Sequence, residues 1–243
     1  RRAIGLLNSI FIQIIMDRTF NTLFMISSVD GKISTGNVDD RDVDKDFPRI
    51  KGLKEGLNQY YALEQQTDIF SLNTGRVMAK IGMNKPKKDI KKLPVSFIII
   101  DNTHLTQLGV RNMLRKSRVL YIVTTNKNHP ALKIKDDGLI ILLYPNKIDF
   151  SNLFTRLKRE FGAKRVTIQS GGTLNSILIR QGLIDRVSLV VAPALIGGKD
   201  TSTLVDGRSL CLENELKEIK VLKLIKCNKL KNSYLHLVYS VSK

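Results

Sequence analysis

Two adjacent glycines, Gly171 and Gly172, mark the part of the sequence with the clearest chemical meaning. They follow a short β-branched run, Arg165–Ile168, and precede an amphipathic stretch, Thr173–Gln181, that stops at Gly182. A helix that begins at glycines offers free backbone N–H groups and the positive end of its dipole to an anion. A Cβ would keep the backbone away from such a ligand, so the pattern predicts a site for a dinucleotide pyrophosphate. The same spacing also suits a plain strand–turn–helix unit.

The elements that must position these glycines alternate between strands and helices. Apolar and β-branched runs predict strands at Thr22–Ser28, Asp68–Leu72, Val95–Ile100, Val119–Thr124, Leu139–Leu143, Arg165–Ile168 and Val187–Ala192. Helical spacing predicts helices at Leu53–Gln66, Val77–Ile81, Phe150–Phe161 and Thr173–Gln181. Two alternating runs, Lys217–Cys227 and Ser233–Ser240, predict a closing antiparallel hairpin. This order predicts an α/β fold of three layers, with a mostly parallel sheet and an antiparallel edge.

The composition is that of an ordinary globular protein, with 42% hydrophobic and 26% charged residues among 243. A net charge of +18 raises nucleic acids and anionic ligands as partners. The densest basic run, Lys85–Lys92, has no interleaved aromatic side chains, and we interpret it as a solvated loop. The aspartate-rich segment Gly36–Asp46 is expected to be a surface loop as well. Nucleic acid is therefore not the expected partner, and the lysine content also fits a genome-wide bias.

The two cysteines, Cys211 and Cys227, and the three histidines show neither metal-type nor redox-type spacing, which predicts no metal site and a reducing cytoplasm. Residues 1–15 pair two arginines with an apolar stretch, as in a signal peptide, but no small-residue cleavage site follows. The run is too short to span a bilayer, and no other segment is long enough to do so. We expect residues 1–16 to be a non-native or disordered extension and residues 17–243 to form one domain.

Three segments together resemble one known family: SVDGKIST (Ser28–Thr35), NTGRV (Asn73–Val77) and the long block Ile168–Gly198. The family is that of the riboflavin-biosynthesis reductases, and the resemblance runs from about Phe20 to Ser240. It implies a dihydrofolate-reductase-like fold, binding of NADPH, hydride transfer to a small molecule and a homodimer. The zinc-binding signature of the deaminase domain that some relatives carry is missing.

The resemblance also implies which residues hold the cofactor. Its phosphates would lie on the glycine turn and the helix start, which are Gly171, Gly172, Thr173, Leu174 and Asn175. The nicotinamide would face the strand end Ile26–Ser27, and the 2′-phosphate would meet Thr124, Thr125 and Asn126. Gly75 and Arg76 would begin a cofactor-binding helix, where a guanidinium suits a phosphate. We expect Gly172 to approach the pyrophosphate at an exposed turn, and a positive φ there would add backbone strain to any substitution.

Two residues of the first turn are predicted to be catalytic. Asp30 would orient the substrate or relay a proton, and Lys32 would stabilise an anionic group beside the nicotinamide. Asp30 also suits a plain turn before glycine. The residues expected to contact the substrate are Ser28, Glu64 and Gln169.

The chain departs from the family pattern mainly at the substrate side. Phe24 stands where the family has a lysine, Glu64 stands near the position of an arginine that meets the substrate phosphate, and Gln169 replaces an acidic residue. The sequence thus predicts an NADPH-dependent reductase of a heterocyclic or ribosylaminopyrimidine-like substrate. One alternative is a pteridine or folate reductase, with Glu55 or Glu64 as its buried acid. The other is a non-catalytic protein that binds nucleotides or nucleic acid, which the charge of +18 favours.

Overall fold

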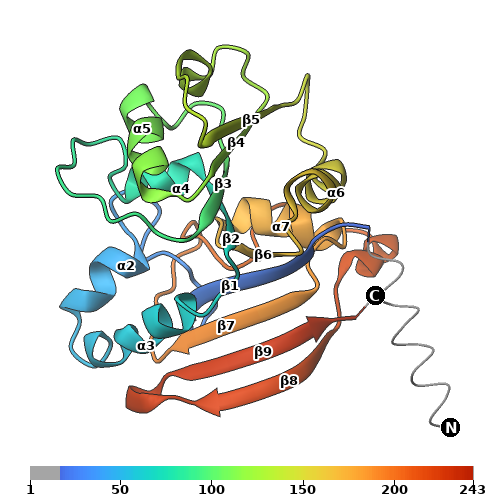
Figure 1. Ribbon diagram of the computed structural model, residues 1–243. Coiled ribbons are helices and arrows are strands. Elements are labelled where there is room, and N and C mark those ends of the chain that lie inside the picture. The colour runs from blue at the N-terminus through green and yellow to red at the C-terminus, as the bar shows by residue number, and fades with distance from the viewer. Residues whose placement is uncertain (1–16, 243) are drawn as a thin grey trace, which may run out of the picture.

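The structure, a computed structural model, describes residues 17–242; the predicted extension, residues 1–16, lies outside them. A single nine-stranded sheet crosses the molecule in the order β5-β4-β3-β2-β6-β1-β7-β9-β8 (Figure 1). The strands are β1 (Phe20–Ser28), β2 (Phe70–Thr74), β3 (Ser96–Ile100), β4 (Leu120–Thr124), β5 (Leu139–Leu143), β6 (Arg165–Ile168), β7 (Arg186–Ala192), β8 (Leu222–Lys229) and β9 (Leu235–Val241).

Seven strands are parallel, and the last two form the predicted antiparallel hairpin at one edge. β1 lies in the middle, with Leu23 opposite Ile168 of β6 on one side and opposite Val187 of β7 on the other. Central strands such as Leu120–Thr124 are buried along their whole length because helices cover both faces of the sheet.

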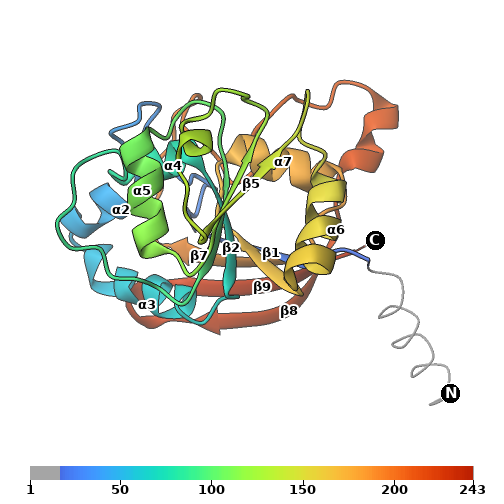
Figure 2. The ribbon, with the colours of Figure 1, turned by 45° about the horizontal axis from the view of Figure 1, so that its top comes forward.

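Two groups of helices cover the two faces (Figure 2). On one face, α6 (Phe150–Phe161) and α7 (Gly172–Arg180) bury their apolar sides against Leu72, Ile98 and Val123. On the other face, α4 (Gly75–Lys80) and α5 (Gln107–Lys116) pack on Ile99 and Ile122. The predicted α/β class with three layers is therefore confirmed.

A third apolar cluster lies beneath α3 (Lys54–Glu64), which packs on Phe24, Ile26 and Val190. The chain reaches α3 through a short helix, α2 (Val43–Asp46), and a 3-10 turn, Phe47–Arg49. The expectation of a loop over Gly36–Asp46 is therefore wrong for its last four residues, since the Asp42 side chain caps the Asp44 N–H and starts α2.

One helix was not predicted, and one strand starts later than expected. The helix α5 was not predicted, because its apolar residues are interrupted by polar ones around Gly109. The hairpin strand β8 begins at Leu222, and the residues before it, Glu213–Glu218, form a 3-10 helix. The basic run Lys85–Lys92 is a loop with mostly exposed lysines, as expected, and Arg115 donates hydrogen bonds to its Lys87 and Lys88 carbonyls at 3.0 and 2.8 Å.

None of the helices within residues 17–242 combines the length and the apolar character needed to span a membrane.

Candidate active site

A crevice opens between β2 and β6, where the two crossovers leave the sheet towards opposite faces. β2 continues into α4 on one face, and β6 continues into α7 on the other. Such a topological switch point forms a crevice at the carboxyl ends of parallel strands, where α/β proteins bind ligands. A cavity of about 710 Å³ lies here, and its wall includes Asn73, Thr74, Gln169, Ser170 and Gly171.

Gly171 presents bare backbone to this cavity. It is the N-cap of α7, with φ −72° and ψ 158°, and no side chain caps the helix. A Cβ placed on Gly171 would meet no atom within 4 Å, so the space in front of it is open. The first N–H groups of a helix have no intrahelical partner. This end of α7 can therefore accept an anion.

The expectation that Gly172 lies at an exposed turn is wrong. Its φ is not positive, and the residue is buried. A Cβ there would collide with the Thr203 carbonyl oxygen and the Asp206 carboxylate, and the Asp206 N–H donates to the Gly172 carbonyl at 3.1 Å. Glycine is thus required at this position by the loop that packs against α7.

The next three residues of α7 differ in what they can offer a ligand. Thr173 is exposed, whereas Leu174 is part of the apolar core. Asn175 is buried and donates to the Leu204 carbonyl at 2.8 Å, while its own oxygen accepts from Ser170 Oγ at 2.6 Å. The side chains of Leu174 and Asn175 are therefore structural, and the Asn175 N–H is also occupied, since it donates to the Gly171 carbonyl at 3.1 Å.

One side of the cavity, called its floor here, is polar and includes Gln169, Glu64 and Tyr60. The Gln169 amide nitrogen donates to Glu64 Oε1 at 2.5 Å and lies 3.4 Å from Tyr60 Oη. Its amide oxygen accepts from Ser71 Oγ at 3.4 Å. Tyr60 stacks on Phe24 with ring centroids 5.2 Å apart, which fixes its hydroxyl at the floor. The structure thus brings Glu64 and Gln169 together inside one cavity.

An acidic wall follows the floor. Asp44 lines the cavity and accepts a hydrogen bond from Tyr61 Oη at 3.0 Å. Desolvation and the neighbouring Asp42 charge raise the pKa of Asp44 to about 6, with a smaller contribution from Glu64. Sequence analysis missed this residue, because its loop showed carboxylates without a motif.

The side wall near β1 contains one of the two residues predicted to face the nicotinamide. Ile26 is buried and lines the cavity together with Met25. Ser27 does not line the cavity, and its hydroxyl donates to the Ser28 carbonyl at 3.1 Å. Of the two predicted residues, only Ile26 therefore faces the cavity.

The Asp30 carboxylate holds the backbone of the loop after β7. It accepts from the Ile196 N–H at 3.1 Å, the Gly197 N–H at 2.6 Å and Ser28 Oγ at 2.5 Å. The Ser28 hydroxyl, and then the Gly197 N–H, lower the pKa of Asp30 to about 2. Neither Asp30 nor Ser28 lines the cavity.

Lys32 is also engaged in the fold. Its ammonium group is buried and donates to the Gly198 carbonyl at 2.7 Å and to the Thr201 carbonyl at 2.8 Å. Lys32 thus holds the loop after β7, and its ammonium is not directed at the cavity. These contacts support the plain turn reading of this segment.

Arg76 lines the cavity and already holds a carboxylate. Its Nε and Nη2 both donate to Asp39 Oδ1, at 3.0 and 2.8 Å, and Lys80 Nζ lies 3.8 Å from the same oxygen. The Arg76 guanidinium lowers the pKa of Asp39. Gly75 precedes Arg76 as the first residue of α4, and a Cβ there would collide with the Asp101 carboxyl group.

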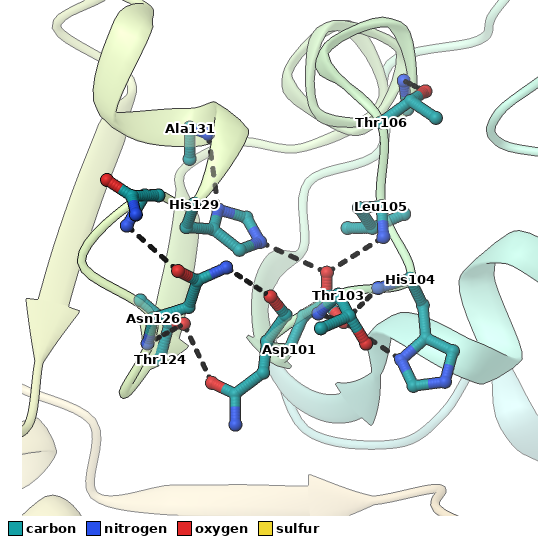
Figure 3. A network of polar contacts seen from close by, with 12 residues as sticks. Asp101, Thr103, His104, Leu105, Thr106, Thr124, Asn126, His129 and Ala131 are labelled. Atoms are coloured by element: carbon teal, nitrogen blue, oxygen red, sulfur yellow. Dashed lines mark hydrogen bonds and ion pairs between the residues drawn. The ribbon is translucent and has the colours of Figure 1, made fainter. Parts of the chain in front are cut away.

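Asp101 organises the loops at the carboxyl ends of β3 and β4 (Figure 3). Its Oδ2 accepts from the Leu105 N–H at 2.8 Å and from His129 Nε2 at 3.0 Å, and its Oδ1 accepts from the His104 N–H at 2.9 Å. Burial alone would raise the pKa of Asp101, but these hydrogen bonds outweigh it and hold the pKa well below its usual range. This buried hub was not expected from the sequence.

The predicted 2′-phosphate residues lie beside this hub. Thr124 Oγ1 donates to Asn102 Oδ1 at 2.9 Å, the Thr125 N–H donates to the same oxygen at 2.8 Å, and Asn126 Nδ2 donates to the Asn102 carbonyl at 2.7 Å. None of the three lines the cavity between β2 and β6. Their donors serve the Asn102 loop in this structure.

The sequence model of the RibD C-terminal domain family matches residues 19–226. Two archaeal relatives are named 2,5-diamino-6-ribosylamino-4(3H)-pyrimidinone 5′-phosphate reductase. That of Archaeoglobus fulgidus is 26% identical over 204 residues, covering 80% of this chain and 89% of the relative. That of Methanothermobacter thermautotrophicus is 24% identical over 204 residues, covering 79% of this chain and 86% of the relative.

Solved structures show the same fold at lower identity. Acinetobacter baumannii RibD superposes with a TM-score of 0.65 at 16% identity, and the match covers 94% of this chain and 59% of that chain. The riboflavin biosynthesis reductase Rib7 of Saccharomyces cerevisiae gives a TM-score of 0.58 at 16% identity, covering 93% of this chain and 91% of the other. The resemblance stated from the sequence motifs is confirmed by the family match.

Proposed function

The chain belongs to the RibD C-terminal domain family, and on this premise we propose that it is a nicotinamide-dependent reductase of a ribosylaminopyrimidine phosphate. The observation that carries the proposal is the cavity at the switch point. It joins the uncapped start of α7 at Gly171 to a floor of hydrogen-bonding groups at Glu64 and Gln169. The first two curated relatives are named as reductases of this class of substrate.

The residues at the α7 end of the cavity fit a dinucleotide. Gly171 leaves open space where a Cβ would stand, and the adjacent N–H groups favour a negative charge. Arg76 offers a guanidinium on the opposite side of the crevice. A bound nicotinamide would supply the hydride, and the protein would supply position and the exclusion of water.

The chain's own groups account for the rest of the reduction. Ile26 and Met25 form an apolar wall that keeps water from the reacting carbon. The Glu64 carboxylate and the Gln169 carbonyl oxygen, which accept from Gln169 Nε2 and Ser71 Oγ, have further lone pairs that would accept hydrogen bonds from the amino groups of a pyrimidine. Reduction of a ribosylamino carbon adds one hydride and one proton. Asp44 lines the cavity and has a pKa raised to about 6, so we assign that proton to its carboxyl group.

We propose NADPH as the preferred cofactor, because Arg76 supplies a cation to its extra phosphate. Thr124, Thr125 and Asn126 can take part only if they give up their hydrogen bonds to the Asn102 loop. A calorimetric titration should show tighter binding of NADPH than of NADH. Equal affinities would contradict this choice of cofactor and leave the reductase assignment standing.

A reductase assay tests the function itself. Purified protein is mixed with NADPH and the pyrimidinone phosphate in the relatives' name. The absorbance of reduced nicotinamide in this mixture should fall with time. Mass spectrometry should show a product that carries one added hydride and one added proton. A protein that binds neither NADPH nor NADH would refute the proposal.

A pteridine reductase remains the second candidate, because Glu64 and Asp44 place carboxyl groups inside the cavity. Glu55 does not support it, since its carboxylate accepts from the Gly52 N–H and lies outside the cavity wall. Dihydropterin in the same assay separates the two substrates.

We also propose a cytoplasmic homodimer. Leu222, Leu224 and Ile225 on the edge strand β8 are 43–54% exposed, and an apolar strand edge of this kind favours pairing with a second chain. A mass twice that of the chain in light scattering would support it, and a monomer at micromolar concentration would contradict it. Both cysteines are free thiols, which agrees with a reducing compartment.

A further inference from the structure

Three lysines gather at the end of the cavity that lies opposite Gly171. Lys91 and Lys92 precede β3, and Lys116 is the last residue of α5; all three line the cavity. They stand at the amino ends of β3 and β4, whereas Gly171 stands at the carboxyl end of β6. The cavity therefore has two separate cationic or electropositive ends with the Glu64–Gln169 floor between them.

The fold holds this basic end in place through backbone contacts. The Leu93 N–H donates to the Lys116 carbonyl at 2.7 Å, which joins the end of the basic run to the end of α5. The Arg115 guanidinium holds the same run a few residues earlier, since it donates hydrogen bonds to the Lys87 and Lys88 carbonyls. These hydrogen bonds use only backbone atoms of the lysines. The lysine side chains therefore remain free to contact a ligand.

Nothing in the described chain neutralises these lysines. Among residues 17–242, no carboxylate lies within ion-pair distance of Lys91, Lys92 or Lys116. Lys116 Nζ lies 5.7 Å from the centroid of the Phe97 ring, which also lines the cavity. Burial lowers the pKa of Lys116, although the Glu64 charge opposes the shift. A half-buried, unpaired ammonium facing a cavity would gain from an anion.

The negative charge of Glu64 affects where a phosphate can bind in the cavity. Glu64 is the last residue of α3, and its carboxylate already accepts a hydrogen bond from the Gln169 amide nitrogen. A phosphate directly against Glu64 would meet a like charge, whereas Lys116 supplies a cation to the same cavity, near enough for the Glu64 charge to act on it.

Resting on the proposed function, we propose that Lys116, together with Lys91 and Lys92, binds the phosphate group of the substrate. The phosphate-binding charge of this chain lies at the end of α5 and of the basic run. The heterocycle then lies on the Glu64–Gln169 floor, between this phosphate and the cofactor at Gly171.

The test compares the phosphorylated substrate with its dephosphorylated form. In Lys116→Gln, affinity for the phosphorylated compound should fall about tenfold or more, while affinity for the dephosphorylated compound stays unchanged. Lys91→Gln should show the same selectivity with a smaller loss, and Lys116→Arg should recover part of the binding. Lys88→Gln is the matched control, because Lys88 belongs to the same run but does not line the cavity. Thermal melts verify that the variants fold.

Equal losses for both compounds in Lys116→Gln, or none for either, would overturn the inference. A failure of the proposed function looks different, since the wild type would then reduce neither compound with either nicotinamide. In that case ribose 5-phosphate is the probe: the wild type should bind it and Lys116→Gln should bind it at least tenfold more weakly. Equal binding by the two proteins, or none, would overturn the inference there too.

Discussion

Gly171 and Gly172 offer a matched pair of substitutions that separates cofactor binding from folding. Gly171→Val places two methyl groups in open space beside the α7 N-terminus, in an extended conformation that a β-branched residue adopts easily. Stability should change by no more than about 0.5 kcal/mol, as at an ordinary surface site. Binding should suffer more, because the valine fills the volume that we assign to the pyrophosphate. We expect a loss of about tenfold or more, equal to about 1.4 kcal/mol.

Gly172→Val should lower stability more than it lowers NADPH affinity. Its Cβ collides with the Thr203 carbonyl and the Asp206 carboxylate, so unfolding should become easier by about 1–3 kcal/mol. Calorimetry with NADPH measures affinity, and urea unfolding measures stability. If Gly171→Val binds NADPH like the wild type while it remains folded, the pyrophosphate does not lie at α7. The cavity at the start of α7 would then no longer support the reductase proposal.

Three other perturbations follow from the same contacts. Asp39→Asn frees Arg76 and should tighten NADPH binding about 1.4- to fivefold at low salt, which corresponds to about 0.2–1 kcal/mol for an exposed ion pair. Unchanged affinity in calorimetry would show that Arg76 meets no anion. Asp101→Ala leaves several buried donors unpaired and should cost about 3 kcal/mol or more in urea unfolding, and a loss below about 1 kcal/mol would show that the hub is not structural. The pKa of Asp44 is raised from 3.8 to about 6, so the folded state binds more protons than the unfolded state and stability should fall as pH rises between these values. Asp44→Asn should flatten that slope in urea midpoints, and an identical slope would contradict the raised pKa.

Much of the architecture was readable from the sequence because its signals are local. The buried strands are continuous apolar runs, and the two hairpin strands near the C-terminus alternate, so type and order were correct even where ends shifted by a few residues. The helix α5 escaped because Gly109 and polar residues break its apolar pattern. Its start had a readable signal in Thr106, whose side chain accepts from the Gly109 N–H.

The site was predicted less well because its contacts join distant parts of the chain. Lys32 donates hydrogen bonds to carbonyls 166 and 169 residues away. No local sequence pattern indicates that the ammonium group of this turn residue will bind a loop so far along the chain. Gln169 and Glu64 were correctly singled out, yet their mutual hydrogen bond depends on how α3 lies on the sheet. Lys116 carried no sequence motif, and only the fold brings it to Lys91 and Lys92.

The central position of β1 has a consequence for synthesis on the ribosome. Both neighbours of β1 lie in the last third of the chain, since Phe20 pairs with Arg165 and Ser28 pairs with Ala192. Strands β2 to β5 follow one another in both sequence and space, so they can associate while translation continues. β1 emerges before them and must wait for residues 165–192, with an apolar strand exposed for most of elongation. Closure of the substrate crevice is therefore among the last events of folding, and a nascent chain stalled before Arg165 should depend on chaperones.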